Sequence, residues 1–161
     1  MNTIIFDLST EGLDPFKHRI IGITTKSKAE ERIFTDRNEK KVLEDFWNYI
    51  RKNEIEKLVG FNSDNFDIPM LILRSMRHRI KTEKIQHSDL RKIIFKNDYK
   101  KGTLKDFQNL LQIEFPNTGF AKMHMSLLWA NNRIKNLEDN LLEDVRVTWL
   151  LYNNLNEVGI I

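Results

Sequence analysis

The sequence contains no cysteine, and this absence excludes two kinds of site. Neither a disulfide framework nor a thiolate-bound metal can form, so nothing in the chain requires an oxidising compartment. Proline and glycine are also scarce, with three and six residues among 161, which leaves little room for disordered linkers. We therefore expect order along nearly the whole chain and a single domain over residues 1–161.

Long apolar runs are missing as well. No stretch approaches the roughly 20 apolar residues that span a bilayer. The first ten residues, MNTIIFDLST, lack the basic start and apolar middle of a signal peptide. We therefore expect a soluble, cytoplasmic protein that has no membrane partner.

The net charge is only +3, but the basic residues are unevenly distributed. Residues 71–110 contain eleven Lys and Arg against four Asp and Glu, so this segment carries +7 and the remainder −4. This distribution suits a protein with one basic face directed at a polyanion. Solvated helix faces would give the same pattern, so charge alone does not decide between the two interpretations.

Hydrophobic periodicity predicts an α/β domain with a mixed sheet. Residues 3–8, 18–27 and 31–36 are typical of three strands in a meander, and residues 57–62 of a buried strand that is parallel to its neighbour. Helices are expected over residues 40–53, within 63–80, over 104–111 and over 136–154.

Three acidic residues occur where packing alone would not place them. Asp7 interrupts an apolar strand, Asp67 stands at the start of a helix, and Asp144 lies in a largely apolar helix. A lone buried carboxylate is costly unless it is paired, hydrogen-bonded or bound to a metal. Together these acids could hold a hard divalent cation, which prefers oxygen ligands. The alternatives are a first-turn helix acid for Asp67 and a surface acid for Asp144.

The segments around these acids resemble, in order, the three motifs of the DEDD 3′-5′ exonucleases: FDLSTEGLDP, GFNSDNFDIPML and LLEDVRVTWLL. The second segment matches best, because five of its residues stand at family positions: Gly60, Asn62, Phe66, Asp67 and Pro69. The chain is most similar to the exonuclease domains of family B DNA polymerases and to related stand-alone exonucleases. This resemblance implies a ribonuclease H-like mixed β-sheet, in which a three-stranded antiparallel meander is joined by parallel strands and flanked by helices.

The resemblance also implies residue roles. Asp7 would bridge two Mg²⁺ or Mn²⁺ ions, Asp144 would hold the ion that activates water, and Asp67 would hold the second ion. Leu13 would wedge against the terminal base, and Asn62 would contact the strand or order the site. The implied activity is hydrolysis of the terminal phosphodiester of single-stranded DNA or RNA.

Further contacts with nucleic acid are expected from an aromatic residue of the second motif and from the basic segment. Cations neutralise phosphates, and aromatic rings stack on bases. The candidates are Phe66, Arg74, Arg77, Arg91, Lys92, Lys96 and Lys101.

The first motif departs from the family at Ser9, where a second acid is usual. Alternate strand residues face the same side, so two carboxylates spaced two residues apart, roughly 6 to 7 Å, can hold one ion. Serine is a neutral and weak ligand. Glu11 has the same parity as Asp7 but would lie about 13 Å away in an extended chain. Glu11 therefore joins the site as a catalytic residue only if the chain turns back, and is otherwise a solvated loop acid.

The third motif departs at the water-activating residue, because Asn140 and Asp139 stand where the family has Tyr or His. Asn140 can orient a water but cannot take its proton, and Asp139 can act as a base only if the helix directs it inward. The sequence thus predicts a metal-dependent 3′-5′ exonuclease with weakened activity. The alternative is a catalytically inactive homologue that binds nucleic acid or a protein partner in DNA replication or repair.

Overall fold

The computed structural model describes residues 2–96, 102–114, 129–131 and 134–161 but not the side chains of residues 134–137, 139 and 140. Its five strands form one mixed sheet in the order β3-β2-β1-β4-β5. The strands are β1 (Thr3–Thr10), β2 (Ile20–Lys26), β3 (Glu31–Thr35), β4 (Lys57–Gly60) and β5 (Gln86–Asp89). The first three pair antiparallel, and β4 and β5 continue the sheet in parallel with β1. This architecture confirms the predicted ribonuclease H-like fold class.

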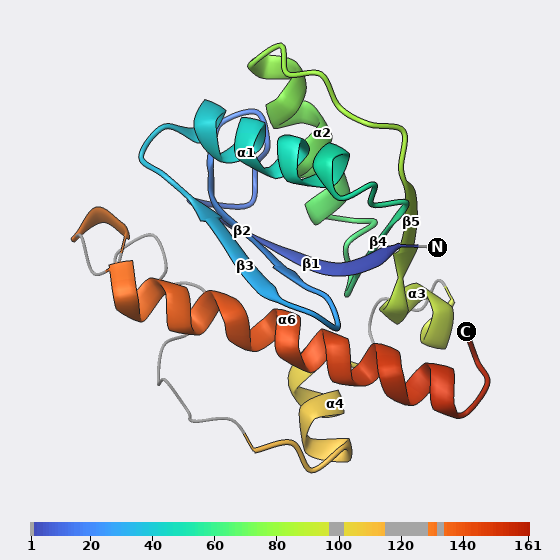
Figure 1. Ribbon diagram of the computed structural model, residues 1–161. Helices are drawn as coiled ribbons and strands as arrows, with labels where there is room; N and C mark the ends of the chain where they lie inside the picture. Colours follow the sequence, from blue (N-terminus) through green and yellow to red (C-terminus); the bar gives the residue numbers. More distant parts are fainter. Residues whose placement is uncertain (1, 97–101, 115–128, 132–133) are drawn as a thin grey trace.

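Helices cover both faces of the sheet (Figure 1). One face carries α1 (Glu39–Lys52) and α2 (Asp67–Arg77), and the other carries α6 (Ile134–Glu157) and α4 (Leu104–Leu110). The short helix α3 (Leu90–Phe95) continues directly from β5. Among the described residues, none of the helices combines the length and apolar character that crossing a bilayer requires.

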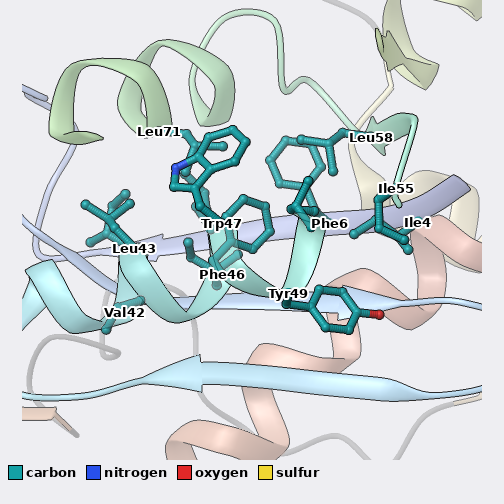
Figure 2. Close-up of a cluster of buried hydrophobic side chains, with 14 of the residues drawn as sticks. Ile4, Phe6, Val42, Leu43, Phe46, Trp47, Tyr49, Ile55, Leu58 and Leu71 are labelled. Atoms are coloured by element: carbon teal, nitrogen blue, oxygen red, sulfur yellow. The ribbon is translucent and has the colours of Figure 1, made fainter. Parts of the chain in front are cut away.

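The core under α1 and α2 is built from alternate residues of β1 and from the apolar stripe of α1 (Figure 2). Ile4, Phe6 and Leu8 point to this face and are at most 2% exposed. Full burial of side chains of this size stabilises the fold by about 2 kcal/mol each. Trp47 of α1 donates its indole N–H to Ser75 Oγ of α2 at 3.0 Å, so the two helices are linked within the core.

The opposite face of β1 packs against α6. Ile5 of β1 shares a buried cluster with Val145 of α6. At Gly22 of β2, an added Cβ would lie 3.1 Å from Leu141 Cδ1, so the glycine allows α6 to approach the sheet closely. Because side chains alternate along a strand, Asp7 and Ser9 face the same side as Ile5.

Two elements differ from the sequence prediction. The four-residue strand β5 and the helix α3 that follows it fall in a segment for which no elements are predicted. The sequence of β5 is QHSD, which has no apolar alternation, and its pairing partner β4 is separated from it by a whole helix. Tertiary pairing thus makes a strand of a segment that lacks the usual local pattern.

Candidate functional site

The carboxyl-terminal half of β1 is the meeting point of the first and third motifs. Ser9 pairs with Gly22, over which Leu141 of α6 lies closely. Asp144 follows Leu141 by three residues and therefore shares its face of the helix. The part of α6 that includes Asp144 therefore packs against β1 and β2, through Leu141 at Gly22 and Val145 beside Ile5.

Asp67 reaches the carboxyl-terminal half of β1 from the second motif. Its Oδ1 accepts the backbone N–H of Leu8 at 3.1 Å, and its side chain is 5% exposed. The pairing of β1 with β4 extends only to Ile5, so Leu8 has no ladder partner on that side and Asp67 supplies the missing acceptor. Asp67 therefore has a structural role, because it satisfies the backbone N–H of Leu8, the residue between Asp7 and Ser9.

The three acids do not, however, form a ready ligand set. Across the described part of the chain, no three His, Cys, Asp or Glu side chains gather in an arrangement that could hold a metal ion. Their oxygen donors suit Mg²⁺ or Mn²⁺ in chemistry. The arrangement of these donors is incomplete, and the neutral, buried Ser9 adds no charge to it.

Glu11 is held by Arg19 at the start of the loop that follows β1. Its Oε1 accepts from Arg19 Nε at 3.1 Å, and its backbone N–H donates to the carbonyl of Arg19 at 2.9 Å. Hydrogen bonding by Arg19 lowers the pKa of Glu11, so this carboxylate is kept ionised. The strand register shifts between Ser9 and Thr10, so the regular alternation of side chains along β1 does not continue to Glu11.

The loop beyond Glu11 presents two apolar side chains to solvent. Leu13, the predicted wedge, is 79% exposed, and Phe16 is 75% exposed. Phe16 is not among the predicted site residues, and nothing in its sequence context marks it. An exposed pair of apolar side chains in one loop is able to contact bases, as the sequence predicts for Leu13.

The loop between β4 and α2 brings together three of the predicted strand-binding residues. Arg91 Nη1 donates to Asn62 Oδ1 at 3.1 Å, and Lys92 Nζ lies 2.9 Å from Asp64 Oδ2 in the same loop. Phe66 instead packs against the core under α1 and α2 and remains only partly exposed. Asn62, Arg91 and Lys92 therefore form one polar surface.

Asp89 organises this surface and is missing from the sequence prediction. It is 3% exposed and caps α3, where it accepts the backbone N–H groups of Arg91 at 2.9 Å and Lys92 at 3.4 Å. It also accepts the N–H groups of Asn62 and Asp64 across the gap between loop and helix. An aspartate placed immediately before an apolar run is the signal that could have identified it as a helix cap.

A Ser–His–Asp arrangement lies beside this carboxylate. Ser63 Oγ is 2.9 Å from His87 Nε2, and His87 Nδ1 is 2.8 Å from Asp64 Oδ1. This order of contacts is that of a nucleophile, base and orienting acid. Ser63 is fully buried, however, so no substrate can reach it, and burial lowers the pKa of His87. The three residues therefore serve as a cross-link between the loop and β5.

The basic segment divides between structural and exposed cations. Arg74 is 3% exposed and binds Glu39 through two nitrogens at 2.8 and 2.6 Å, so its predicted contact with phosphates is wrong. Arg77 is exposed on α2, on the face of the sheet opposite α6, and Lys96 is exposed after α3. Lys101 lies outside the described residues, as do the side chains of Asp139 and Asn140.

Comparison with known proteins identifies relatives over the full chain and over part of it. An uncharacterized protein of Methanocaldococcus jannaschii is 34% identical over 175 residues, which cover 100% of this chain and 99% of the relative. A DNA polymerase of Archaeoglobus fulgidus is 33% identical over 84 residues, which cover 50% of this chain but 11% of the polymerase.

The fold matches that of a polymerase structure. The family B DNA polymerase of the hyperthermophilic archaeon Pyrobaculum calidifontis superposes with a TM-score of 0.82 and 18% identity, over 98% of this chain and 25% of the polymerase. At that identity the likeness shows the fold. The family described as "Predicted 3'-5' exonuclease related to the exonuclease domain of PolB" matches residues 16–112, which include Asp67 and Asp89 but neither Asp7 nor Asp144. The chain belongs to this family of exonuclease-like proteins related to the exonuclease domain of PolB.

Proposed function

We propose that this protein binds the 3′ end of single-stranded DNA or RNA and hydrolyses the terminal phosphodiester in the 3′-to-5′ direction. The supporting observation is that Asp67 accepts the backbone N–H of Leu8, between Asp7 and Ser9. The part of α6 that includes Asp144 packs against β1 and β2, through Leu141 at Gly22 and Val145 beside Ile5. The activity is weaker than that of a four-carboxylate site, because Ser9 replaces one ligand.

The proposed cofactor is Mg²⁺ or Mn²⁺, held by Asp7, Asp67 and Asp144. Such an ion would activate the attacking water and stabilise charge on the phosphate. The described residues contain no complete group of three metal ligands, so binding of the strand is proposed to rest on other side chains. Asn62 and Arg91 are placed to hold the strand, and Leu13 to contact the terminal base.

A second function is supported by the first motif. Ser9 is neutral and buried, and the carboxylate of Glu11 is engaged by Arg19. These two observations favour a catalytically inactive homologue that keeps the strand-binding loop. Such a protein would bind nucleic acid, or a protein partner in DNA replication or repair, without cleaving the strand.

A nuclease assay separates the two functions. Single-stranded DNA and RNA labelled at the 5′ end are incubated with Mn²⁺ and with the natural chain, Asp7→Ala, Ser9→Glu or Ser9→Gln. We expect the natural chain to shorten the strands and Asp7→Ala to lose about 100-fold or more in rate, as when a charge-stabilising group is removed from a site. Ser9→Glu should increase the rate by restoring a ligand.

Ser9→Gln is the matched control, because it adds the same bulk at the buried position without the charge. It should not increase the rate. If only Ser9→Glu degrades the strands, the natural protein is a silenced exonuclease and the second function holds. Cleavage that survives Asp7→Ala would contradict both.

A further inference from the structure

The loop over residues 61–66 is joined to the end of β5 by a single buried carboxylate. Asp89 pairs with Gly60 in the sheet, so its side chain lies directly beside the loop. Its Oδ1 accepts the N–H of Asn62 at 2.9 Å, and its Oδ2 accepts the N–H of Asp64 at 3.1 Å. Both oxygens of Asp89 therefore hold the backbone of the loop.

The same carboxylate fixes the first turn of α3. The N–H groups of Arg91 and Lys92 both donate to its Oδ1. With the N–H groups of Asn62 and Asp64, the Asp89 carboxylate accepts four backbone donors in all. Asp89 thus fixes the position of the loop relative to Arg91 and Lys92 at the start of α3.

This junction has a direct consequence for the side chain of Asn62. The residue has a φ of +59°, a left-handed conformation that asparagine tolerates better than most residues. Its Oδ1 accepts from Arg91 Nη1 at 3.1 Å and from Asn65 Nδ2 at 3.2 Å. Because the Oδ1 of Asn62 accepts these two hydrogen bonds, its Nδ2 points away from Arg91 and Asn65. The Nδ2 group can only donate hydrogen bonds.

The position of Asn62 relative to β1 brings this donor close to the motif acids. Asn62 follows the end of β4 by two residues, and Asp67, at the other end of the same loop, accepts the backbone N–H of Leu8 in β1. A group that only donates hydrogen bonds binds an acceptor, and the most abundant acceptors on a nucleic-acid strand are its phosphate oxygens. The proposed cleavage site therefore has a phosphate donor at its flank.

We infer that Asp89 is a positioning residue for strand binding: it holds Asn62 and Arg91 so that the Asn62 amide donates to a phosphodiester oxygen of the bound strand. This inference rests on the proposed function and goes beyond it, because it names the residue on which the strand contact depends. Asp89 itself touches no substrate. Pre-set donors bind more tightly because less conformational freedom is lost when the ligand arrives.

A second buried carboxylate offers a matched control. Glu39 accepts the N–H of Ile20 at 2.7 Å and binds Arg74, and it is 4% exposed at the start of α1. It lies on the face of the sheet opposite α6. Glu39→Gln and Asp89→Asn therefore remove the same charge from comparable burial, and only the second change touches the loop over residues 61–66.

The test measures the affinity of fluorescein-labelled single-stranded DNA by anisotropy in EDTA, where cleavage cannot proceed. Both Glu39→Gln and Asp89→Asn should lower the melting temperature. Only Asp89→Asn should raise the Kd, by about tenfold, the usual effect of disturbing one well-formed contact to a charged group. In the Asn62→Ala background the effect of Asp89→Asn should disappear, because Asp89 acts through that amide.

Asn65→Ala keeps the test valid if Asp89→Asn does not fold. Asn65 is exposed and donates to Asn62 Oδ1, so its loss should raise the Kd by about twofold in the natural chain and not in Asn62→Ala. Additive losses, or an equal loss in Glu39→Gln, would overturn the inference and leave the proposed function standing. Failure of the natural chain to bind any strand would remove the proposed function and the inference together.

Discussion

Two loops flank the motif acids, and they are held in different ways. The loop over residues 61–66 is fixed by buried groups, chiefly Asp89 and the Ser63–His87 contact. The loop over residues 11–19 is closed by an ion pair between Glu11 and Arg19, whose side chains are 29% and 49% exposed. The loop that carries Asn62 is thus fixed by buried groups, whereas the loop that carries Glu11 and Leu13 is held by a contact at the surface.

This contrast has an energetic scale. Leaving a buried hydrogen-bonding group unpaired costs about 1 to 3 kcal/mol, whereas an exposed ion pair contributes about 0 to 1 kcal/mol. Changes in the first loop should therefore affect both stability and strand binding. Changes in the second should leave stability nearly unchanged and should act, where they act at all, on catalysis.

The largest effect is expected from Gly60→Ala. An added Cβ would lie 2.5 Å from Ser63 Oγ and 3.1 Å from the ring of Phe6, so the buried loop must move. We expect a loss of about 2 to 3 kcal/mol in the free energy of unfolding, measured by urea denaturation. Gly12→Ala is the matched change in the other loop: its Cβ meets the ring of His18, a partly exposed side chain that can turn away.

Gly12→Ala should therefore cost less than about 1 kcal/mol. If the two alanine variants are equally destabilised, the loops are equally constrained and the contrast between them is wrong. A Gly60→Ala protein that keeps full stability would mean that the loop over residues 61–66 can rearrange without loss.

The sequence predicts features that depend on neighbouring residues and misses features that depend on residues far apart in the chain. The apolar run around Asp7 predicts β1, and the second motif predicts a helix that begins near Asp67, as the structure shows. These features depend on residues close together in the chain. Arg91 and Lys92, which the sequence suggests as cations for phosphates, contact the loop over residues 61–66 from 29 and 28 residues further along the chain.

The features that the sequence misses depend on distant partners. Arg74 is buried because Glu39, 35 residues earlier, lies across the core from it. The role of Asp89 arises from a strand, β5, whose residues have no alternation of their own. Glu11 binds Arg19, eight residues later, and the strand register shifts between Ser9 and Thr10, and no local pattern signals either feature.

A smaller effect is expected at the contact that ties α6, and with it Asp144, to the sheet. Arg146 and Lys26 bind Glu31 of β3, and hydrogen bonding by Arg146 in particular lowers the pKa of Glu31 to about 2. The ordinary pKa is 4.5, so the stabilisation is fully present above about pH 4.5 and is lost as the pH falls from 4.5 toward 2. Because Arg146 is 39% exposed, we expect only about 1 kcal/mol from this pair.

Glu31→Gln checks this expectation. Chemical denaturation of the natural chain should show stability falling between pH 4.5 and pH 2 more steeply than in the variant, and the two should differ by about 1 kcal/mol at pH 6. Equal pH slopes would mean that the contact does not hold α6. In that case the position of α6 against the sheet depends on the buried contacts of Leu141 and Val145 alone.

The smallest effect on stability is expected from Arg19→Ala, which releases Glu11. The lost ion pair is exposed, so the free energy of unfolding should change by less than about 1 kcal/mol. The informative measurement is the rate of strand cleavage with Mn²⁺, with Lys17→Ala as a control that removes a nearby, exposed positive charge and leaves Glu11 bound to Arg19. We expect both variants to cleave at the rate of the natural chain, because the backbone bond from the Glu11 N–H to the carbonyl of residue 19 is kept in each of them. A rate that rises in Arg19→Ala but not in Lys17→Ala would show that Glu11 serves as the missing ligand once Arg19 no longer holds it, and that the natural chain has a complete ligand set restrained by Arg19.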